Sequence, residues 1–279
     1  MTGTEKGTDT GESQAEAHDG VLHPGAQAQP VEGSAEGGPR ARALSALRRA
    51  AVYRVMALGF SEPGEDLVRA LCSGDLVSEL VDALATLGAS DSACGPALQR
   101  LRRAASEMEA AGAAAPLREL SVEYARLFTG PGRPDVAGYE SEYTEARPDG
   151  GRGRLHGAAT AAVAAVYREE GVAVAAALRE PPDSVAAELE FLYLLSRREE
   201  QAWQADDEGE ALRLRRTAGR FLAEHASRWL PKLAADVRAT SGSHFYAGFA
   251  EVLETFLGHE TTASPGSAAD DERRGAGAG

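Results

Sequence analysis

Apolar residues recur at three- and four-residue spacing along almost the whole central part of this chain. Between residues 243 and 257 they stand at i, i+4, i+7 and i+11, as Phe245, Phe249, Val252 and Phe256. This spacing places them on one face of an α-helix. Alanine, the best helix former, is abundant, whereas only 6% of the 279 residues are aromatic. With no convincing strand pattern anywhere, the sequence predicts an all-α domain.

The same periodicity gives the approximate bounds of the helices. They are expected over 40–58, 63–72, 75–87, 95–111, 116–128, 154–179, 184–204, 208–226 and 243–257. Gly59 and Gly112 are predicted to end helices, and Pro231 is predicted to mark a break near Trp229. Residues 180–184 form a proline-rich joint between two helical halves, where Asp183 or Ser184 can cap the next helix.

Both ends of the chain differ in composition from the rest. Residues 1–38 are rich in Gly, Glu, Ser, Thr and Pro, and 260–279 are similar. Such segments bury too little apolar surface to offset their ordering entropy, so we expect two disordered tails around an all-helical domain at 39–259. Of the net charge of −14, −6 lies in 1–38 and −2 in 260–279, which leaves −6 for the domain. This charge argues against a nucleic-acid partner and suits a positively charged one, although an acidic surface can also serve solubility alone.

The motifs of common enzymes and metal sites are missing from the sequence. There is no HExxH, no Glu-x-x-His pair, no GxSxG elbow, no P-loop and no GxGxxG. The two cysteines, Cys72 and Cys94, are too few for a disulfide framework or a four-ligand zinc site. No run reaches the roughly 20 apolar residues of a membrane span, and the N-terminus has no export signal pattern. We therefore expect a cytoplasmic, non-catalytic protein without metal or cofactor.

One long stretch, 129–153, breaks the helical rhythm. It holds six glycines and three prolines, so we expect a loop there rather than a helix. Connectors of about 25 residues are unusual inside compact domains and are often functional. This one contains an unbroken run of aromatic, acidic and hydroxyl residues, Tyr139-Glu140-Ser141-Glu142-Tyr143. Further on, Glu188 lies in a strongly apolar stretch, where a carboxyl group needs a hydrogen-bond or charge partner.

Three segments together resemble the TorD/DmsD/NarJ family of molybdoenzyme maturation chaperones. The first, YARLFTGPGRP at 124–134 followed by GYESEYTE at 138–145, is similar to a family signature. Its matching residues are Tyr124, Leu127, Phe128, Gly130, Pro131, Tyr139, Glu140, Ser141 and Tyr143. The second, EPPDSVAAELEFLYLL at 180–195, resembles the family's Glu-Pro-x-Asp-His joint and the helix after it. The third comprises the C-terminal segments RFLAEHASRWLPKLAADV and SHFYAGFAEVLETFL, and the resemblance extends over about 40–258.

The resemblance implies a TorD-like bundle of about ten helices that binds a molybdoenzyme precursor of the dimethyl sulfoxide reductase type. The implied partners are the apo catalytic subunit, its twin-arginine signal peptide, or both, held until cofactor insertion and export. Family members are often dimeric, so a homodimer is a further expected partner. The chain departs from the family at Ser184, where many members have His, and at Ala137 and Gly138, where a Pro often precedes the Tyr. Any role that depends on that His is in doubt.

The expected client-binding residues are Phe128, Tyr139, Glu140, Ser141, Glu142, Tyr143, Pro181, Asp183, Ser184 and Glu188. Carboxylates would face the signal arginines, and aromatic side chains with Pro181 would line an apolar side. Structural roles stay open beside these: Asp183 as a helix cap, the tyrosines as loop anchors and Glu188 as a core contact. Two other functions also stay open. One is a NarJ-like assembly factor that reads no signal peptide, and the other is a nucleotide-hydrolysing enzyme.

Overall fold

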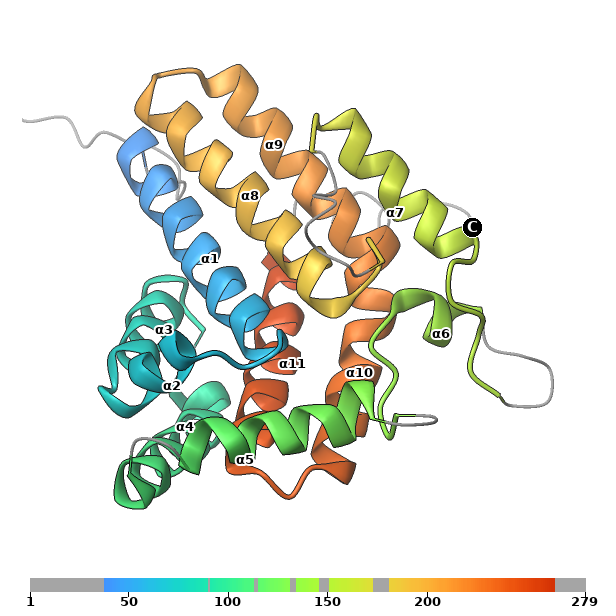
Figure 1. Cartoon of the computed structure of the whole chain (residues 1–279). Helices are drawn as coiled ribbons and strands as arrows, with labels where there is room; N and C mark the ends of the chain where they lie inside the picture. Colours follow the sequence, from blue (N-terminus) through green and yellow to red (C-terminus); the bar gives the residue numbers. More distant parts are fainter. Residues whose placement is uncertain are drawn as a thin grey trace, which may run out of the picture. The chain divides into compact units, whose positions relative to one another are not determined.

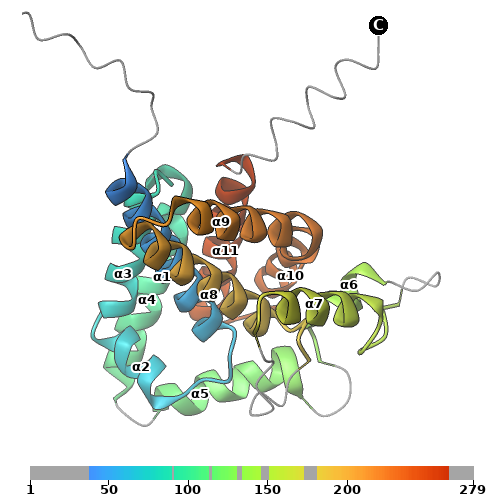
Figure 2. The same cartoon turned by 90° about the horizontal axis from the view of Figure 1, so that it is seen from above.

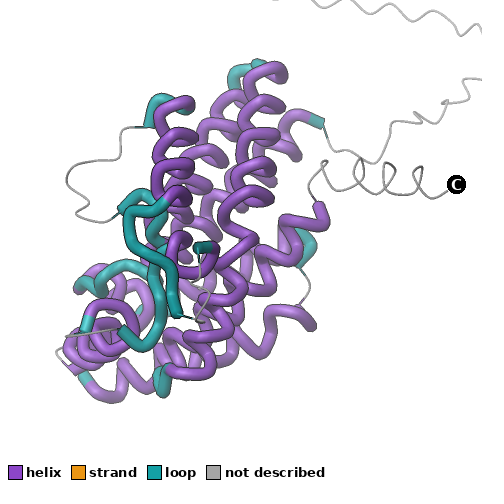
Figure 3. The backbone as a smooth tube through the Cα atoms, turned by 90° about the vertical axis from the view of Figure 1, so that its right-hand side faces the viewer, coloured by secondary structure: helices purple, strands orange, loops and turns teal. Residues whose placement is uncertain are grey.

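A computed structural model of the chain describes residues 38–89, 91–112, 115–130, 134–145, 151–172 and 181–263. These residues fold into α-helices joined by loops, with two short π-helical turns (Figure 1). In chain order the elements are α1 (Pro39–Gly59), α2 (Glu65–Cys72), α3 (Asp75–Thr86), α4 (Asp91–Ala111), α5 (Ala115–Tyr124), η1 (Ala125–Thr129), α6 (Glu140–Thr144), α7 (Ala158–Glu169), α8 (Val185–Gln204), α9 (Glu208–Phe221), η2 (Leu222–Ala226), α10 (Ser227–Thr240) and α11 (His244–Ala263). Since the described residues contain no strand (Figure 3), the predicted all-α class is confirmed.

The long helices pack along one another in sequence-distant pairs. α1 lies along α8, and α8 lies along α9, while α11 packs against both α4 and α10 (Figures 1 and 2). The largest side chains meet between these helices and are almost completely shielded from solvent: Tyr53, Phe221, Trp229, Phe245, Tyr246, Phe249 and Phe256. The aromatic face predicted for 243–257 is therefore part of the core, whereas Leu44, Leu47 and Leu58 of α1, which share the periodic spacing, are exposed.

Two buried ion pairs tie the first and last helices to the middle of the chain. Arg49 of α1 donates to both carboxylate oxygens of Glu199 in α8, at 2.7 and 2.8 Å. Arg215 of α9 donates to Glu260 of α11 at 3.0 Å. α11 continues to Ala263, so the buried Glu260 belongs to the helical body. The tails expected to be disordered otherwise lie outside the described residues.

Several helix bounds differ from the sequence expectation. α10 runs straight through Pro231, which was predicted to mark a break. Proline removes one helical hydrogen bond, but fully buried neighbours, including Trp229 and Leu230, hold the helix against the core. α7 ends at Glu169 and is followed by Gly171 in the left-handed region, with φ of 66°. The remainder of the helix predicted to residue 179 lies mostly outside the described residues.

The glycine-rich stretch 129–153 also holds more structure than expected. Residues 140–144 form α6, a single helical turn, although no helix was predicted there. The helix predicted over 116–128 is divided into α5 and the π-helical η1. None of the described helices combines the length and the apolar character needed to cross a bilayer.

Candidate functional site

The polar loop and the proline-rich joint, about 40 residues apart in sequence, are in direct contact. Tyr139 and Ser184 form an isolated antiparallel β-bridge. The amide of Glu140 donates to the carbonyl of Asp183 at 2.9 Å, and the amide of Val185 donates to the carbonyl of Gly138 at 3.0 Å. The structure therefore places the two segments that resemble the family signatures next to each other.

The two polar residues of the joint cap different helices. Ser184 is the N-cap of α8, and its hydroxyl accepts a hydrogen bond from the amide of Ala187 at 3.3 Å. Asp183, which the sequence also offered as the cap of this helix, instead accepts from the amide of Ser141 in the first turn of α6 at 3.1 Å. Asp183 therefore stabilises the loop helix rather than α8, because a carboxylate at a helix N-terminus satisfies a free amide.

Three carboxyl groups converge beneath this junction. Glu140 of α6, Asp183 of the joint and Glu188 of α8 are each no more than 1% exposed. Oε2 of Glu140 lies 2.9 Å from Nδ1 of His225 in η2, and the indole of Trp229 in α10 donates to Oε2 of Glu188 at 3.0 Å. The expectation that Glu188 has a polar partner is thus confirmed, and this partner is Trp229.

Burial and the neighbouring Glu140 carboxylate raise the pKa of Glu188 well above its usual value. Water is excluded, and two acids share one small space, so the neutral form of Glu188 is favoured. Three buried oxygens in the junction accept or donate no hydrogen bond within the described part of the chain: Ser141 Oγ, Asp183 Oδ1 and Glu188 Oε1. Buried side-chain atoms without a hydrogen-bond partner also occur elsewhere in the described residues, so these three are notable because they belong to one junction.

Aromatic side chains form one wall of the junction. The ring of Tyr143 lies 5.7 Å from that of Trp229, and its hydroxyl donates to Asp236 of α10 at 2.8 Å. Tyr167 of α7 donates to the carbonyl of Pro182 at 2.9 Å. Burial, followed by the hydrogen bond to Asp236, raises the pKa of Tyr143, so its hydroxyl stays protonated. Each tyrosine anchors the loop or the joint to a neighbouring helix.

The other predicted residues lie at different depths. Tyr139, Glu142 and Pro181 are half-buried. The backbone carbonyl of Glu142 accepts from the amide of Gly153 at 2.9 Å. Phe128 lies in η1, where its ring contacts those of Phe60, Tyr124 and Tyr246. It is a core residue of the α5–α11 side, and none of these ring contacts links it to the buried carboxyl groups.

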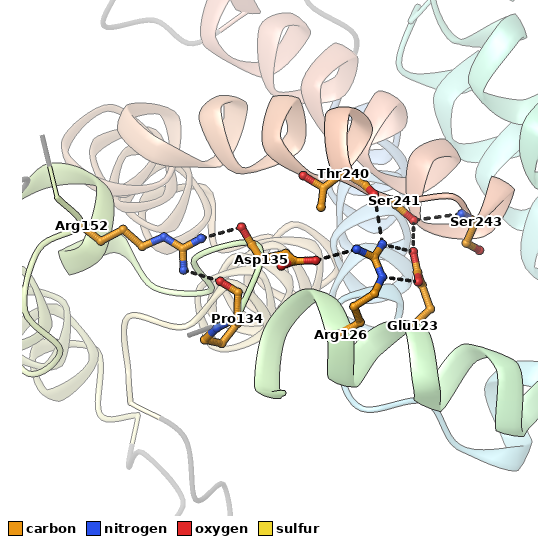
Figure 4. Close-up of polar contacts among 8 residues, drawn as sticks. All are labelled: Glu123, Arg126, Pro134, Asp135, Arg152, Thr240, Ser241 and Ser243. Carbon is orange, nitrogen blue, oxygen red and sulfur yellow. Dashed lines mark hydrogen bonds and ion pairs between the residues drawn. The ribbon is translucent and has the colours of Figure 1, made fainter. Parts of the chain in front are cut away.

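Two arginines hold the start of the loop in place (Figure 4). Arg126 of η1 bonds both Glu123 and Asp135, and it also donates to the carbonyl of Thr240 at 3.0 Å. From the other side, Arg152 donates to the carbonyls of Pro134 at 2.9 Å and Asp135 at 2.6 Å. These contacts fix residues 134–135 between η1 and the turn that precedes α11.

The end of the loop is anchored separately. The carboxylate of Glu145 accepts from the amide of Ala159, at the start of α7, at 2.7 Å. The segment 139–145, which we call the cover segment, is therefore fastened at both ends. Between these ends its Ser141 amide contacts the Asp183 carboxylate, and its Glu140 carboxyl group neighbours that of Glu188.

Sequence reasoning missed His225, Trp229, Tyr167 and Arg152 as members of this site. His225 and Trp229 are four residues apart and so lie one turn apart on one helical face, but the apolar pattern around them indicated core residues. The expectation that Glu188 needs a polar partner was the available signal for these residues. The sequence alone, however, could not say which side chain would supply the donor. Among the described residues, no group of three or more His, Cys, Asp or Glu side chains is arranged to hold a metal ion.

Comparison with known proteins places the chain in a family. The family model described as nitrate reductase delta subunit matches residues 88–235, more than half of the chain. This match covers the loop, the joint, His225 and Trp229. A search of curated proteins finds no match. The chain therefore belongs to the nitrate reductase delta subunit family, the NarJ/TorD family of chaperones for molybdoenzyme assembly.

Proposed function

We propose that this protein binds the apo catalytic subunit of a molybdoenzyme of the dimethyl sulfoxide reductase type, its twin-arginine signal peptide, or both. It would hold this precursor in the cytoplasm until the cofactor is inserted and export can begin. One observation carries the proposal: in a member of this chaperone family, three carboxyl groups gather where the loop meets the joint, with aromatic side chains beside them. We infer no catalytic residue and no bound cofactor or metal.

The chemistry of the junction suits an arginine-rich segment followed by an apolar one. Carboxylates pair with guanidinium groups through two parallel hydrogen bonds, which fixes orientation as well as affinity. Asp183, Glu140 and Glu142 would supply these contacts, and Glu188 would add a buried carboxyl group beside Glu140. Tyr139, Tyr143 and Pro181 would contact the apolar part of the peptide, because tyrosine packs on both guanidinium and aliphatic groups.

The binding test uses a synthetic peptide with a Ser-Arg-Arg signal and its apolar segment, titrated calorimetrically. We expect a Kd near micromolar, about −8 kcal/mol. Asp183→Asn should weaken binding by about 2–5 kcal/mol, because it removes one charged partner of an arginine. The exposed Glu109→Gln on α4 serves as the matched control and should bind like the native chain. If Asp183→Asn is folded and binds equally well, Asp183 only caps α6.

A second function is favoured by the description of the matching family model, nitrate reductase delta subunit. In this alternative the protein assembles a cytoplasm-facing molybdoenzyme subunit and reads no signal peptide. Ser184 in place of the family's His is compatible with such a different client.

Co-purification from the native cell, with mass spectrometry of the bound proteins, separates the two functions. A molybdopterin subunit with its signal attached supports the first, and one without a signal supports the second. Recovery of no such subunit when molybdoenzymes are induced would refute both. Light scattering on the same preparation tests the proposed homodimer, and incubation with nucleotide and Mg²⁺ should give no hydrolysis.

A further inference from the structure

The acidic groups of the junction are closed off from solvent in this structure. Glu140, Ser141, Asp183, Ser184 and Glu188 are each at most 2% exposed. A guanidinium group could not reach Asp183 or Glu188 without displacing whatever covers them. The cover segment, residues 139–145, is bridged to the joint at Tyr139 and Ser184. Its Ser141 amide donates to the Asp183 carboxylate, and its Glu140 carboxyl group lies beside that of Glu188.

The cover segment is attached through several polar contacts and one aromatic contact. One backbone hydrogen bond joins Glu140 to the carbonyl of Asp183, the Asp183 carboxylate caps its helix, and Glu145 accepts from the amide of Ala159. The Tyr143 hydroxyl reaches Asp236, and the Tyr143 ring packs against Trp229. Its outer residues, Tyr139, Glu142 and Tyr143, are half-buried rather than enclosed. Each of these hydrogen bonds can be exchanged for one to water when the segment lifts, so opening does not require the helical core to unfold.

The space beneath the cover segment lacks a cation from the described part of the chain. The titratable groups that face Glu188 are Glu140 from α6, Asp183 from the joint and Tyr167 from α7, with His225 of η2 behind Glu140. No described arginine or lysine is hydrogen-bonded to Asp183 or Glu188. One oxygen of each carboxyl group, together with the Ser141 hydroxyl, is buried without a partner. An incoming guanidinium group can donate to the unpaired Asp183 oxygen, and to Glu188 once its carboxyl group has lost the proton.

We propose that residues 139–145 form a cover that lifts off the joint when a client arginine binds, and that Glu188 releases a proton in the same step. This inference rests on the proposed function and concerns the regulation of the same site. In the closed state the Glu188 carboxyl is neutral. In the open state it faces a guanidinium group and water, so the carboxylate forms and its proton passes to the buffer.

The direction of the pH dependence follows from this proton balance. Burial and Glu140 raise the pKa of Glu188 in the closed protein. Exposure and a client cation return it to or below the ordinary value for glutamate, about 4.3. At pH values between the pKa of Glu188 in the bound state and its pKa in the closed protein, binding releases up to one proton. Affinity should therefore rise up to about tenfold per pH unit in this range. Outside this window the dependence due to Glu188 should disappear.

Proton release can be measured directly by calorimetry. The native chain is titrated with the twin-arginine peptide at one pH, in phosphate and in Tris, whose ionisation enthalpies differ. We expect the apparent binding enthalpy to depend on the buffer, in proportion to the protons released. Glu188→Gln should remove the Glu188 part of this difference. Equal proton release by the native chain and Glu188→Gln would overturn the proton step.

A reversible disulfide tests the cover itself. Tyr139 and Ser184 face each other between the two flanking backbone hydrogen bonds, where Cα atoms are about 4.5 Å apart. This lies within the range that a disulfide spans, about 4.4–6.8 Å. We would make Tyr139→Cys with Ser184→Cys in a Cys72→Ser background and compare the oxidised with the reduced form. The reduced form is the matched control, because the two differ only in the cross-link.

Peptide affinity should fall at least about tenfold on oxidation and return on reduction. The disulfide holds the cover segment on the joint, so the open form that binds the peptide is no longer populated. Equal binding by the oxidised and reduced forms would overturn the cover. If the substitutions themselves abolish binding, the buffer comparison on the native chain decides. A native chain that does not bind the peptide at all refutes the proposed function, whereas one that binds it without buffer dependence refutes only the coupling to Glu188.

Discussion

Replacing Glu188 by glutamine should stabilise the protein, by an amount that grows with pH. Glutamine has the same shape, and its carbonyl oxygen can accept from the Trp229 indole as the Glu188 carboxyl group does. The substitution therefore changes the charge that Glu188 can carry and little else. Any effect on the free energy of unfolding should come from ionisation.

The sign follows from the raised pKa of Glu188 in the folded chain. Above the ordinary glutamate value of about 4.3, the unfolded chain ionises Glu188 while the folded chain keeps it neutral. The folded state then binds more protons, so Glu188 lowers stability by about 1.4 kcal/mol for each pH unit until its folded pKa is reached. Glutamine does not titrate. The stability of Glu188→Gln relative to the native chain should therefore increase at this rate.

Urea denaturation of both proteins between about pH 5.5 and 8 measures this difference, because the titration of all other groups largely cancels. Glu190→Gln, at an exposed position two residues further along α8, is the matched control for the same substitution outside the junction. A flat profile for Glu188→Gln, or a variant less stable than the native chain at pH 7.5, would contradict a neutral Glu188 in the folded protein.

Three further substitutions test the packing around the site by the same urea assay. Ser184→Ala removes the cap of α8 and should cost about 1 kcal/mol, whereas no loss would mean that the cap is not needed. Arg49→Met leaves Glu199 buried without its cation and should cost about 3–5 kcal/mol; a change below about 1 kcal/mol would contradict a desolvated pair. Gly59→Ala would place its Cβ against the ring of Phe249 and should cost about 1–3 kcal/mol, and an unchanged midpoint would show that the ring moves aside freely.

The helices were largely predictable because periodicity reports burial directly. The ranges 40–58 and 243–257 correspond to α1 and α11, and Gly112 follows the end of α4 as expected. The apolar face expected for 40–58 was partly wrong, because Leu44, Leu47 and Leu58 are exposed. Pro231 misled the prediction because local propensity ignores the core contacts that hold α10. The π-helical turns η1 and η2 were also missed, since a single inserted residue barely alters the apolar spacing.

The site was only partly predictable, for a different reason. Sequence pattern found the loop and the joint, but it could not show that Asp183 caps α6, because that contact joins residues 42 positions apart. It also suggested an open acidic surface, whereas the acidic groups face inward. The direction of a side chain in a loop depends on what the loop packs against, and this information is spread over α7, α8 and α10. His225 and Trp229 were missed for the same reason.

Buried carboxyl groups in the described residues fall into two sets. In the first, every carboxylate faces an arginine: Glu199 with Arg49, Glu200 with Arg197 and Glu260 with Arg215. In the second, the groups lie beneath the cover segment and no described arginine is hydrogen-bonded to them: Glu140, Asp183 and Glu188. The fold can therefore supply a cation to a buried acid, and under the cover segment it does not.

An unpaired buried polar atom costs about 1–3 kcal/mol, and the junction has three of them. Stability alone would favour apolar side chains or an arginine at this place. Local rules are most often broken where a protein functions, because binding uses what folding leaves unsatisfied. The missing cation is thus best explained as the part that a client brings. A bound client arginine should therefore stabilise the fold more than a lysine in the same peptide, since only guanidinium can bridge two carboxylates through parallel hydrogen bonds.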